Sequence, residues 1–286
     1  MKKRIETSTR RLVESALLIA IGTVLSVLTV AQLPYGGSVT LASMLPMVLL
    51  AYRHGTVWGL GCGVVYGILQ QLLGLSTLSY FTTWQSIVAI ILLDYVVAFA
   101  VSGLGGIFRR TRLSQGVALT LGALLVCLLR YTCHVVSGAT VWAGLSIPTT
   151  AALAYSFIYN ATYMIPETVV LLLATLYLGS LLDFGKEDIG YLSTARTGSR
   201  TADILAALSG LLTVGAVGFD IVMVFARLQD AETGEFNIQN LDVAQFAGSY
   251  LMAIVIATAA TVVAVGVMLI VRYYLLHKHE SGSVNE

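Results

Sequence analysis

The sequence predicts an all-α integral membrane protein, and its composition is the first observation that supports this fold class. Of the 286 residues, 57% are hydrophobic and 11% are charged, and the mean hydropathy is +0.85. A soluble globular domain has about 45–50% apolar and about 25% charged residues. The formal net charge of +1 gives no support for a nucleic-acid partner.

The second observation is a series of apolar runs, since a membrane-spanning helix needs roughly 20 predominantly apolar residues. We expect eight helices, near residues 12–31, 40–52, 56–73, 84–107, 116–137, 150–182, 203–226 and 247–272. The second run is too short to cross upright. It is therefore expected to be partly re-entrant or embedded among its neighbours.

The distribution of basic residues orients these helices. With eight crossings and a cytoplasmic N-terminus, every Lys and Arg except Arg130 and Arg227 falls on the cytoplasmic side. Cytoplasmic segments of membrane proteins carry an excess of Lys and Arg. Both termini are therefore expected in the cytoplasm.

A polar segment divides the chain. Residues 183–202, DFGKEDIGYLSTARTGSRTA, are rich in Gly, Ser and Thr and predict a cytoplasmic linker. We expect a six-helix membrane domain over 1–182, two further transmembrane helices within 203–272 and a cytoplasmic tail over 273–286. No internal repeat or inverted pair of broken helices is evident in the sequence.

The sequence gives no indication of an enzyme. Its three cysteines, Cys62, Cys127 and Cys133, lie in apolar runs without metal-type or redox spacing. No nucleophile stands with a base, and no metal-ligand set has plausible spacing. We therefore expect no catalytic residue, no metal and no cofactor.

Three charges stand out within the predicted spans: Asp94, Arg130 and Glu167. Each costs about 2.5–3.5 kcal/mol near a helix centre and requires a partner, a cavity or a function. Arg130 is expected to pair with either Glu167 or Asp94. The three charges together are negative, which favours a cationic ligand in an outward-facing cavity.

Residues 155–167, YSFIYNATYMIPE, place polar side chains along one helical face. Ser156, Asn160, Tyr163 and Glu167 follow one another at spacings of four, three and four. Residues at such spacings stack on one side of a helix. We expect this face to point into the bundle.

Aromatic residues gather at the predicted outer surface, at positions 35, 80, 84, 142, 155 and 159. One interpretation is an interfacial aromatic belt, which needs no ligand. The other is a set of rings beside a carboxylate, which holds a flat organic cation at about 0.5–2 kcal/mol for each face-on contact. The sequence leaves both interpretations open.

Four segments together carry a resemblance to a known family: LPYGGSVTLASMLP at 33–46, LDYVVAF at 93–99, RYTCHVVSGATVW at 130–142 and YSFIYNATYMIPE at 155–167. Over residues 10 to about 182 the chain resembles the thiamine-specific substrate-binding subunit, or S component, of energy-coupling factor (ECF) transporters. The resemblance implies a six-helix protein of a prokaryotic plasma membrane that captures thiamine at the outer face. It also implies partners: a membrane coupling protein and two ATP-binding cassette ATPases.

The resemblance implies a role for several residues. Asp94, with Tyr95 beside it, would face the cationic thiazolium ring and the aminopyrimidine. His134 and Trp142 would flank the ligand rings, and Gly138 would permit a close backbone approach. The acidic residue is often glutamate in this family, so the shorter Asp94 requires either a closer helix or a bridging water.

Four further positions are carried over from the resemblance. Tyr155 and Asn160 would hydrogen-bond the aminopyrimidine. Trp84 stands where a tyrosine is expected and is assigned to the site, together with Tyr35 in the first external loop.

The resemblance also assigns a docking site on the first helix. Ala16 and Ala20 form a small-xxx-small pair near the cytoplasmic end. Such a pair commonly serves ordinary helix packing. In the family, an alanine pair at this place docks the coupling protein.

Residues 203–272 have no counterpart in the six-helix pattern. Ala253, Ala257, Ala260 and Ala264 share one face of the last helix, and Asp220 and Arg227 are spaced for pairing. The segment is either an accessory hairpin that packs on the bundle, or one that modifies docking or replaces a missing partner.

An alternative function remains open. A self-sufficient ion-coupled transporter of an organic cation would use Asp94 and Glu167 as protonation sites. Within the first interpretation, another vitamin is also an alternative ligand, because likeness of fold does not select a ligand.

Overall fold

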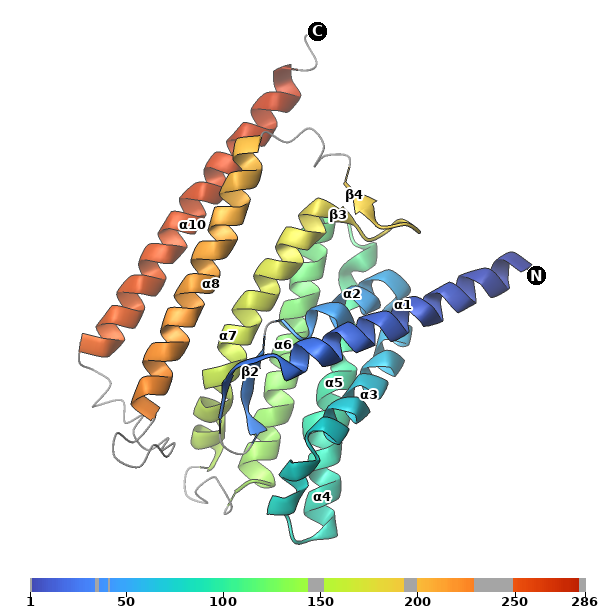
Figure 1. The fold of residues 1–286 in the computed structure, drawn as a ribbon, viewed down its shortest axis with the longest axis vertical. Coiled ribbons are helices and arrows are strands. Elements are labelled where there is room, and N and C mark those ends of the chain that lie inside the picture. The colour runs from blue at the N-terminus through green and yellow to red at the C-terminus, as the bar shows by residue number, and fades with distance from the viewer. Residues whose placement is uncertain are drawn as a thin grey trace. The chain divides into compact units, whose positions relative to one another are not determined.

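The computed structural model describes residues 2–33, 36–40, 42–143, 152–192, 200–228 and 249–282. Helices dominate these ranges, which confirms the all-α fold class (Figure 1). The chain forms two compact units. The first comprises Met1–Gly179 with Phe184–Glu187, and the second comprises Ser180–Asp183 with Asp188–Glu286.

The elements of the first unit follow in chain order: α1 (Lys2–Val27), β1 (Thr29–Gln32), β2 (Ser38–Thr40), α2 (Leu45–His54), α3 (Thr56–Leu73), the 3₁₀ helix η2 (Leu75–Tyr80), α4 (Trp84–Ile90), the π-helix η3 (Ile91–Val97), α5 (Ala98–Ala100), the 3₁₀ helix η4 (Val101–Arg110), α6 (Gln115–Thr140) and α7 (Ala152–Leu181). The bounds of α3 are those predicted from the sequence. The other expected helices differ from these bounds at one or both ends.

A short β-hairpin follows α1, where the sequence predicted helix as far as residue 31. Strands β1 and β2 pair antiparallel, with Ala31 opposite Val39 and a bulge between Thr29 and Ala31. The predicted second helix, 40–52, begins later because β2 occupies 38–40. Helix α2 starts at Leu45 with Pro46 in its first turn, where the missing N–H of proline has no cost.

The segment from Trp84 to Arg110 is helical throughout but changes its hydrogen-bonding pattern three times, from α to π, back to α and then to 3₁₀. A π-helical turn occupies Ile91–Val97, and a 3₁₀ run occupies Val101–Arg110. Single π-helical turns are rare and occur frequently at functional sites. This turn carries Asp94 and Tyr95.

Glycines allow η4 to pack directly on the backbones of α2 and α3. A Cβ atom on Gly103 would lie 2.1 Å from the Leu60 nitrogen, and one on Gly106 would lie 2.1 Å from the Ala51 oxygen. No side chain fits at such distances, so only glycine is compatible with this contact. The core beside it includes the fully buried Tyr66, whose ring meets that of Phe99 edge-on at 5.3 Å.

Five helical segments in the described part of the chain are long and apolar enough to cross a membrane: Thr56–Leu73, Trp84–Arg110, Gln115–Thr140, Ala152–Leu181 and Met252–Arg272. Three of the eight expected crossings do not meet that standard. Helix α2 has ten residues, and α1 carries Arg10, Arg11 and Glu14 close to its apolar part. The apolar part of the seventh expected helix is limited to Ile204–Asp220.

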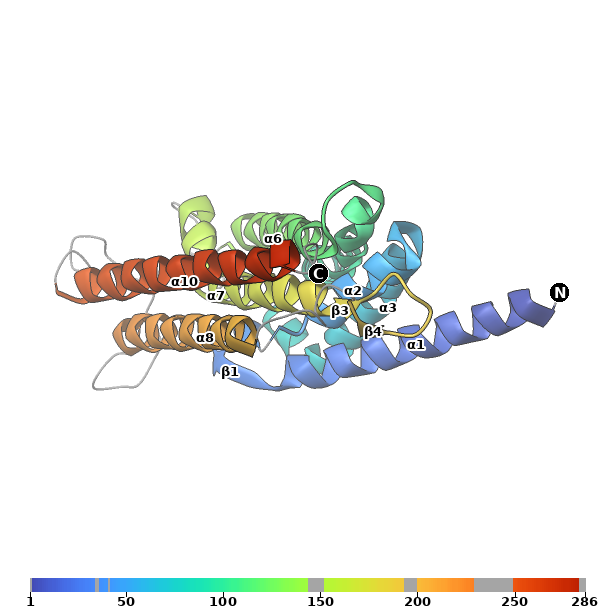
Figure 2. The same cartoon turned by 90° about the horizontal axis from the view of Figure 1, so that it is seen from above.

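The second unit contains a small strand pair, β3 (Leu182–Asp183) with β4 (Gly190–Tyr191), and two long helices, α8 (Arg200–Leu228) and α10 (Ser249–Gly282). Helices α8 and α10 pack side by side (Figure 2). The Thr258 hydroxyl donates a 2.7 Å hydrogen bond to Asp220 across this contact. The side chain of Arg227, the expected partner of Asp220, lies outside the described part of the structure.

The final helix is longer than the sequence indicated. The segment 273–286 was expected to be a tail, but α10 continues to Gly282. Hydropathy marks only the part of a helix that is buried in lipid, so a polar helical extension leaves no signal of this kind.

Candidate ligand-binding site

The carboxylate of Asp94 is the centre of a polar cluster between η3 and α6. His134 Nδ1 lies 2.9 Å from Oδ1 of Asp94. The Ser137 hydroxyl donates to Oδ2 at 2.7 Å, and the Trp142 indole N–H donates to the same oxygen at 3.2 Å. His134 and Ser137 are three residues apart on α6 and therefore share the face that meets Asp94.

Aromatic side chains pack around Trp142, on one side of the Asp94 cluster. The Trp142 ring meets Phe81 at a centroid distance of 4.7 Å and Tyr80 at 5.9 Å. Tyr95 and Tyr155 are half-buried against the same core. Of the outer aromatic residues, this arrangement gathers three beside the carboxylate: Tyr80, Trp142 and Tyr155.

The polar face of α7 points into the protein, as the four-three-four spacing predicts. Ser156 and Asn160 are buried, with relative exposures of 0% and 4%. The Tyr163 hydroxyl donates to Asn160 Oδ1 at 2.6 Å, and the Ser156 hydroxyl donates to the Val135 carbonyl of α6 at 2.9 Å. This network joins α7 to the part of α6 that carries His134.

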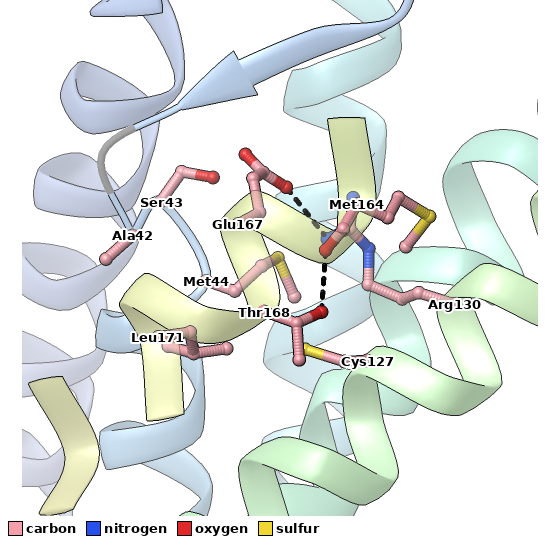
Figure 3. A pocket seen from close by; sticks show the side chains of 9 residues that line it. All are labelled: Ala42, Ser43, Met44, Cys127, Arg130, Met164, Glu167, Thr168 and Leu171. Atoms are coloured by element: carbon pink, nitrogen blue, oxygen red, sulfur yellow. Dashed lines mark hydrogen bonds and ion pairs between the residues drawn. The ribbon is translucent and has the colours of Figure 1, made fainter. Parts of the chain in front are cut away.

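Arg130 lies beside Glu167, and not beside Asp94. The closest atoms of the pair, Arg130 Nη1 and Glu167 Oε2, are 3.9 Å apart, and the two side chains are only 9% and 12% exposed (Figure 3). Glu167 also accepts hydrogen bonds from the backbone N–H of Thr40, at 2.9 Å, and from the Thr40 hydroxyl. The Arg130 guanidinium lies over the Phe99 ring at 4.6 Å. The pair therefore joins α6, α7 and β2.

A small cavity borders this ion pair, lined by Ala42, Ser43, Met44, Cys127, Arg130, Met164, Glu167, Thr168 and Leu171 (Figure 3). The space open to the centre of a water molecule is about 10 Å³. That volume suits about one water and is far below the ~300 Å³ of ordinary ligand pockets. The Asp94 cluster is therefore the stronger candidate for a ligand site.

The remaining expected site residues differ in their placement. Gly138 is buried one turn after His134. Trp84 is 70% exposed at the start of α4, so the structure does not bring it into the cluster. Tyr35 lies outside the described residues.

Two members of the cluster were not predicted. Ser137 is three residues from His134, and helical spacing alone would have indicated it. Phe81 follows η2 in an extended conformation, and no periodic pattern in the sequence marks it.

Comparison with known proteins adds independent information about the first unit. The family model described as "Thiamine transporter protein (Thia_YuaJ)" matches residues 12–183, more than half of the chain. The chain belongs to this family. Its members are transporters and not enzymes, as expected from the sequence.

One relative in this family is the "Thiamine transporter ThiT" of Bacillus subtilis (strain 168). It is 33% identical over 171 residues, which span 56% of this chain and 85% of that protein. A solved structure of ThiT from Listeria monocytogenes matches with a TM-score of 0.50 at 21% identity, covering 63% of this chain and 95% of that one. The structural match shows that the fold is shared.

Proposed function

We propose that this chain is the thiamine-capturing S component of an ECF importer. In this proposal it lies in a prokaryotic plasma membrane, with both termini in the cytoplasm, and binds thiamine from the outer face. The observation that supports this most strongly is the Asp94 carboxylate, which is held between His134, Ser137 and Trp142.

The chemistry of thiamine matches this cluster. Its thiazolium ring carries a permanent positive charge, and a carboxylate in a site of low dielectric attracts such a charge far more strongly than in water. The partners of Asp94 in the cluster include no guanidinium or ammonium group, so its negative charge is available to a cation. The indole and imidazole rings supply flat faces of the right size.

The position of Trp142 suggests how the ligand enters. A ring placed between Trp142 and His134 displaces the indole from its 3.2 Å hydrogen bond to Asp94. Thiamine then replaces the indole N–H as a partner of the carboxylate. Tyr155 and Asn160 bind the aminopyrimidine, and Asn160 Oδ1 has a lone pair beyond the one that Tyr163 occupies.

The exposed face of helix α1 supports the proposed docking of a coupling protein. Ala16 and Ala20 are exposed, and the neighbouring Val13, Leu17 and Val24 are each more than half exposed. A small-residue seam flanked by aliphatic side chains permits close approach of another transmembrane helix. The sequence has no GxxxxGK[ST] phosphate-binding loop, so ATP would be hydrolysed by the partner ATPases.

A binding titration tests the capture of thiamine. We expect the purified wild-type protein to bind thiamine, and both Asp94→Asn and Trp142→Ala to weaken it. Trp84→Ala is the matched control, because this tryptophan is exposed outside the cluster. Unchanged affinity in both site variants would remove the assignment.

A transport assay tests the partners. Cells that express the chain together with an ECF coupling protein and ATPases should accumulate thiamine, whereas cells without that module should not. Uptake without the module would instead support the ion-coupled transporter, in which Asp94 and Glu167 are protonation sites.

A further inference from the structure

A second carboxylate, Glu14 of α1, stands at the centre of a separate polar cluster. Arg53, at the end of α2, approaches it with Nη2 at 2.9 Å from Oε2 and 3.0 Å from Oε1, and with Nε at 3.1 Å from Oε2. Arg10 and His54 add contacts at 3.1 and 3.0 Å. This cluster involves residues at the predicted cytoplasmic end of the bundle and none of the Asp94 site.

Arg53 also holds a segment that is distant in sequence. Its Nη1 donates to the carbonyls of Phe184 and Lys186 at 3.1 and 3.2 Å, and its Nη2 donates to the carbonyl of Glu187 at 3.2 Å. Its side chain is only 7% exposed. One guanidinium thus serves a carboxylate and three backbone carbonyls, which a lysine ammonium with three donors and no planar fork cannot reproduce.

The held segment, Phe184–Glu187, has an unusual place in the chain. It belongs to the first unit, although Ser180–Asp183 before it and Asp188–Glu286 after it belong to the second. Gln115 secures its start, accepting from the Phe184 N–H at 2.9 Å and donating to the Gly179 carbonyl at 3.0 Å. The segment is therefore the point at which the chain leaves the six-helix part for α8 and α10.

The same cluster fixes the inner face of α1. Ser15 is 4% exposed and accepts a 2.9 Å hydrogen bond from the Trp58 indole N–H. The Arg11 guanidinium covers the Trp58 ring at 3.8 Å. With Glu14 and Ser15 held inward, the exposed Ala16 and Ala20 face outward.

We propose that the Glu14–Arg53 junction positions α1 for docking of the coupling protein. Through this junction, a force that the docked coupling protein exerts on α1 reaches α2 and the rest of the bundle. Arg53 is a positioning residue: it joins the helix that presents Ala16 and Ala20 to α2 and to the segment that leads into the second unit. This inference rests on the proposed function, because it assigns a role in coupling and none in thiamine binding.

The test compares Arg53→Ala, Arg53→Lys and Glu14→Gln in the full-length chain. Arg112→Ala is the matched control, since Arg112 is an exposed arginine at the predicted cytoplasmic side. Three quantities are measured for each: thiamine affinity of the purified protein, thiamine uptake by cells with the ECF module, and co-purification of the coupling protein.

We expect thiamine affinity to stay within about twofold of wild type in every variant. Uptake and co-purification should fall by about tenfold or more in Arg53→Ala, because α1 loses one partner of a partly buried charge pair together with three carbonyl contacts of the same guanidinium. Arg53→Lys should recover part of the uptake, since it keeps the charge near Glu14 but not the carbonyl contacts. Arg53→Ala and Glu14→Gln combined should lose less than the two separate losses together.

Two results would overturn the junction's role. One is wild-type uptake by Arg53→Ala and Glu14→Gln. The other is loss of thiamine binding along with uptake in all three variants, which would make the cluster a requirement for folding only. A wild-type protein that binds no thiamine would instead contradict the proposed function, so the two failures are distinguishable.

Discussion

The carboxylates of Asp94 and Glu167 lie in the same bundle but have different partners. Glu167 stands beside the Arg130 guanidinium and accepts two hydrogen bonds from Thr40. Asp94 is bonded by an imidazole, a hydroxyl and an indole. A carboxylate matched by an arginine of the same chain stabilises the structure. A carboxylate whose partners are an imidazole, a hydroxyl and an indole retains negative charge that can attract a cationic ligand.

The largest expected effect tests the Glu167 side of this comparison. Glu167→Leu leaves Arg130 buried without its carboxylate, and we expect a loss of about 3–5 kcal/mol of stability. Thermal unfolding of the purified protein in detergent measures it. The double variant Arg130→Leu with Glu167→Leu should recover most of the loss, because an apolar pair removes both buried charges. A double variant as unstable as the single one would show that the pair is not the cause.

The second prediction tests the Asp94 side. Asp94→Asn should weaken thiamine binding by about thirtyfold or more, which corresponds to about 2 kcal/mol for a desolvated charge contact. Its stability should change by only about 1 kcal/mol, since the amide keeps an acceptor for the indole or the hydroxyl. Calorimetric titration and thermal unfolding of the same sample provide both numbers. The reverse pattern, with lost stability and normal affinity, would contradict the division between the two carboxylates.

A smaller effect is expected at Ser137, which orients Asp94 and has no assigned contact with the ligand. Ser137→Ala removes the 2.7 Å hydrogen bond to Oδ2. We expect a threefold to tenfold loss of affinity, because the net value of such a bond is about 0.5–1.5 kcal/mol. Ser79→Ala is the control: that hydroxyl is exposed and bonds its own turn. Equal affinities in the two variants would show that Ser137 has no orienting role.

The smallest effect is expected at the tryptophan outside the cluster. Trp84→Ala should change thiamine affinity by less than about twofold, because its ring lies outside the Asp94 cluster and is 70% exposed. The same titration measures it. A large loss would return Trp84 to the binding site assigned from the sequence.

Local periodicity predicted much of this structure. The α3 bounds and the inward face of α7 follow from patterns within single helices, whereas the sequence left Glu167 and Asp94 both open as partners of Arg130. Whether Asp94, His134 and Trp142 bind thiamine stays a prediction, although the structure brings them together.

The features that sequence reasoning missed depend on partners distant in the chain. Nothing local distinguishes Arg53 from the other basic residues of the chain, yet its carbonyl contacts lie more than 130 residues away. The β-hairpin after α1 also left no sign in the apolar pattern. The π-helical turn left none either, because hydrophobicity is similar in helices of different hydrogen-bonding type.

The π-helical turn at Ile91–Val97 has a consequence for how this protein accommodates change. Each residue of an α-helix advances the side-chain direction by about 100°. A π-helical turn departs from this value, so it changes the direction of the side chains after it relative to those before it. The π-helical turn thus sets the direction of Asp94 relative to Gly103 and Gly106 of η4. Removing one residue from the turn would rotate the two ends of the helical segment relative to each other. Either the glycines of η4 or the Asp94 carboxylate would then face lipid.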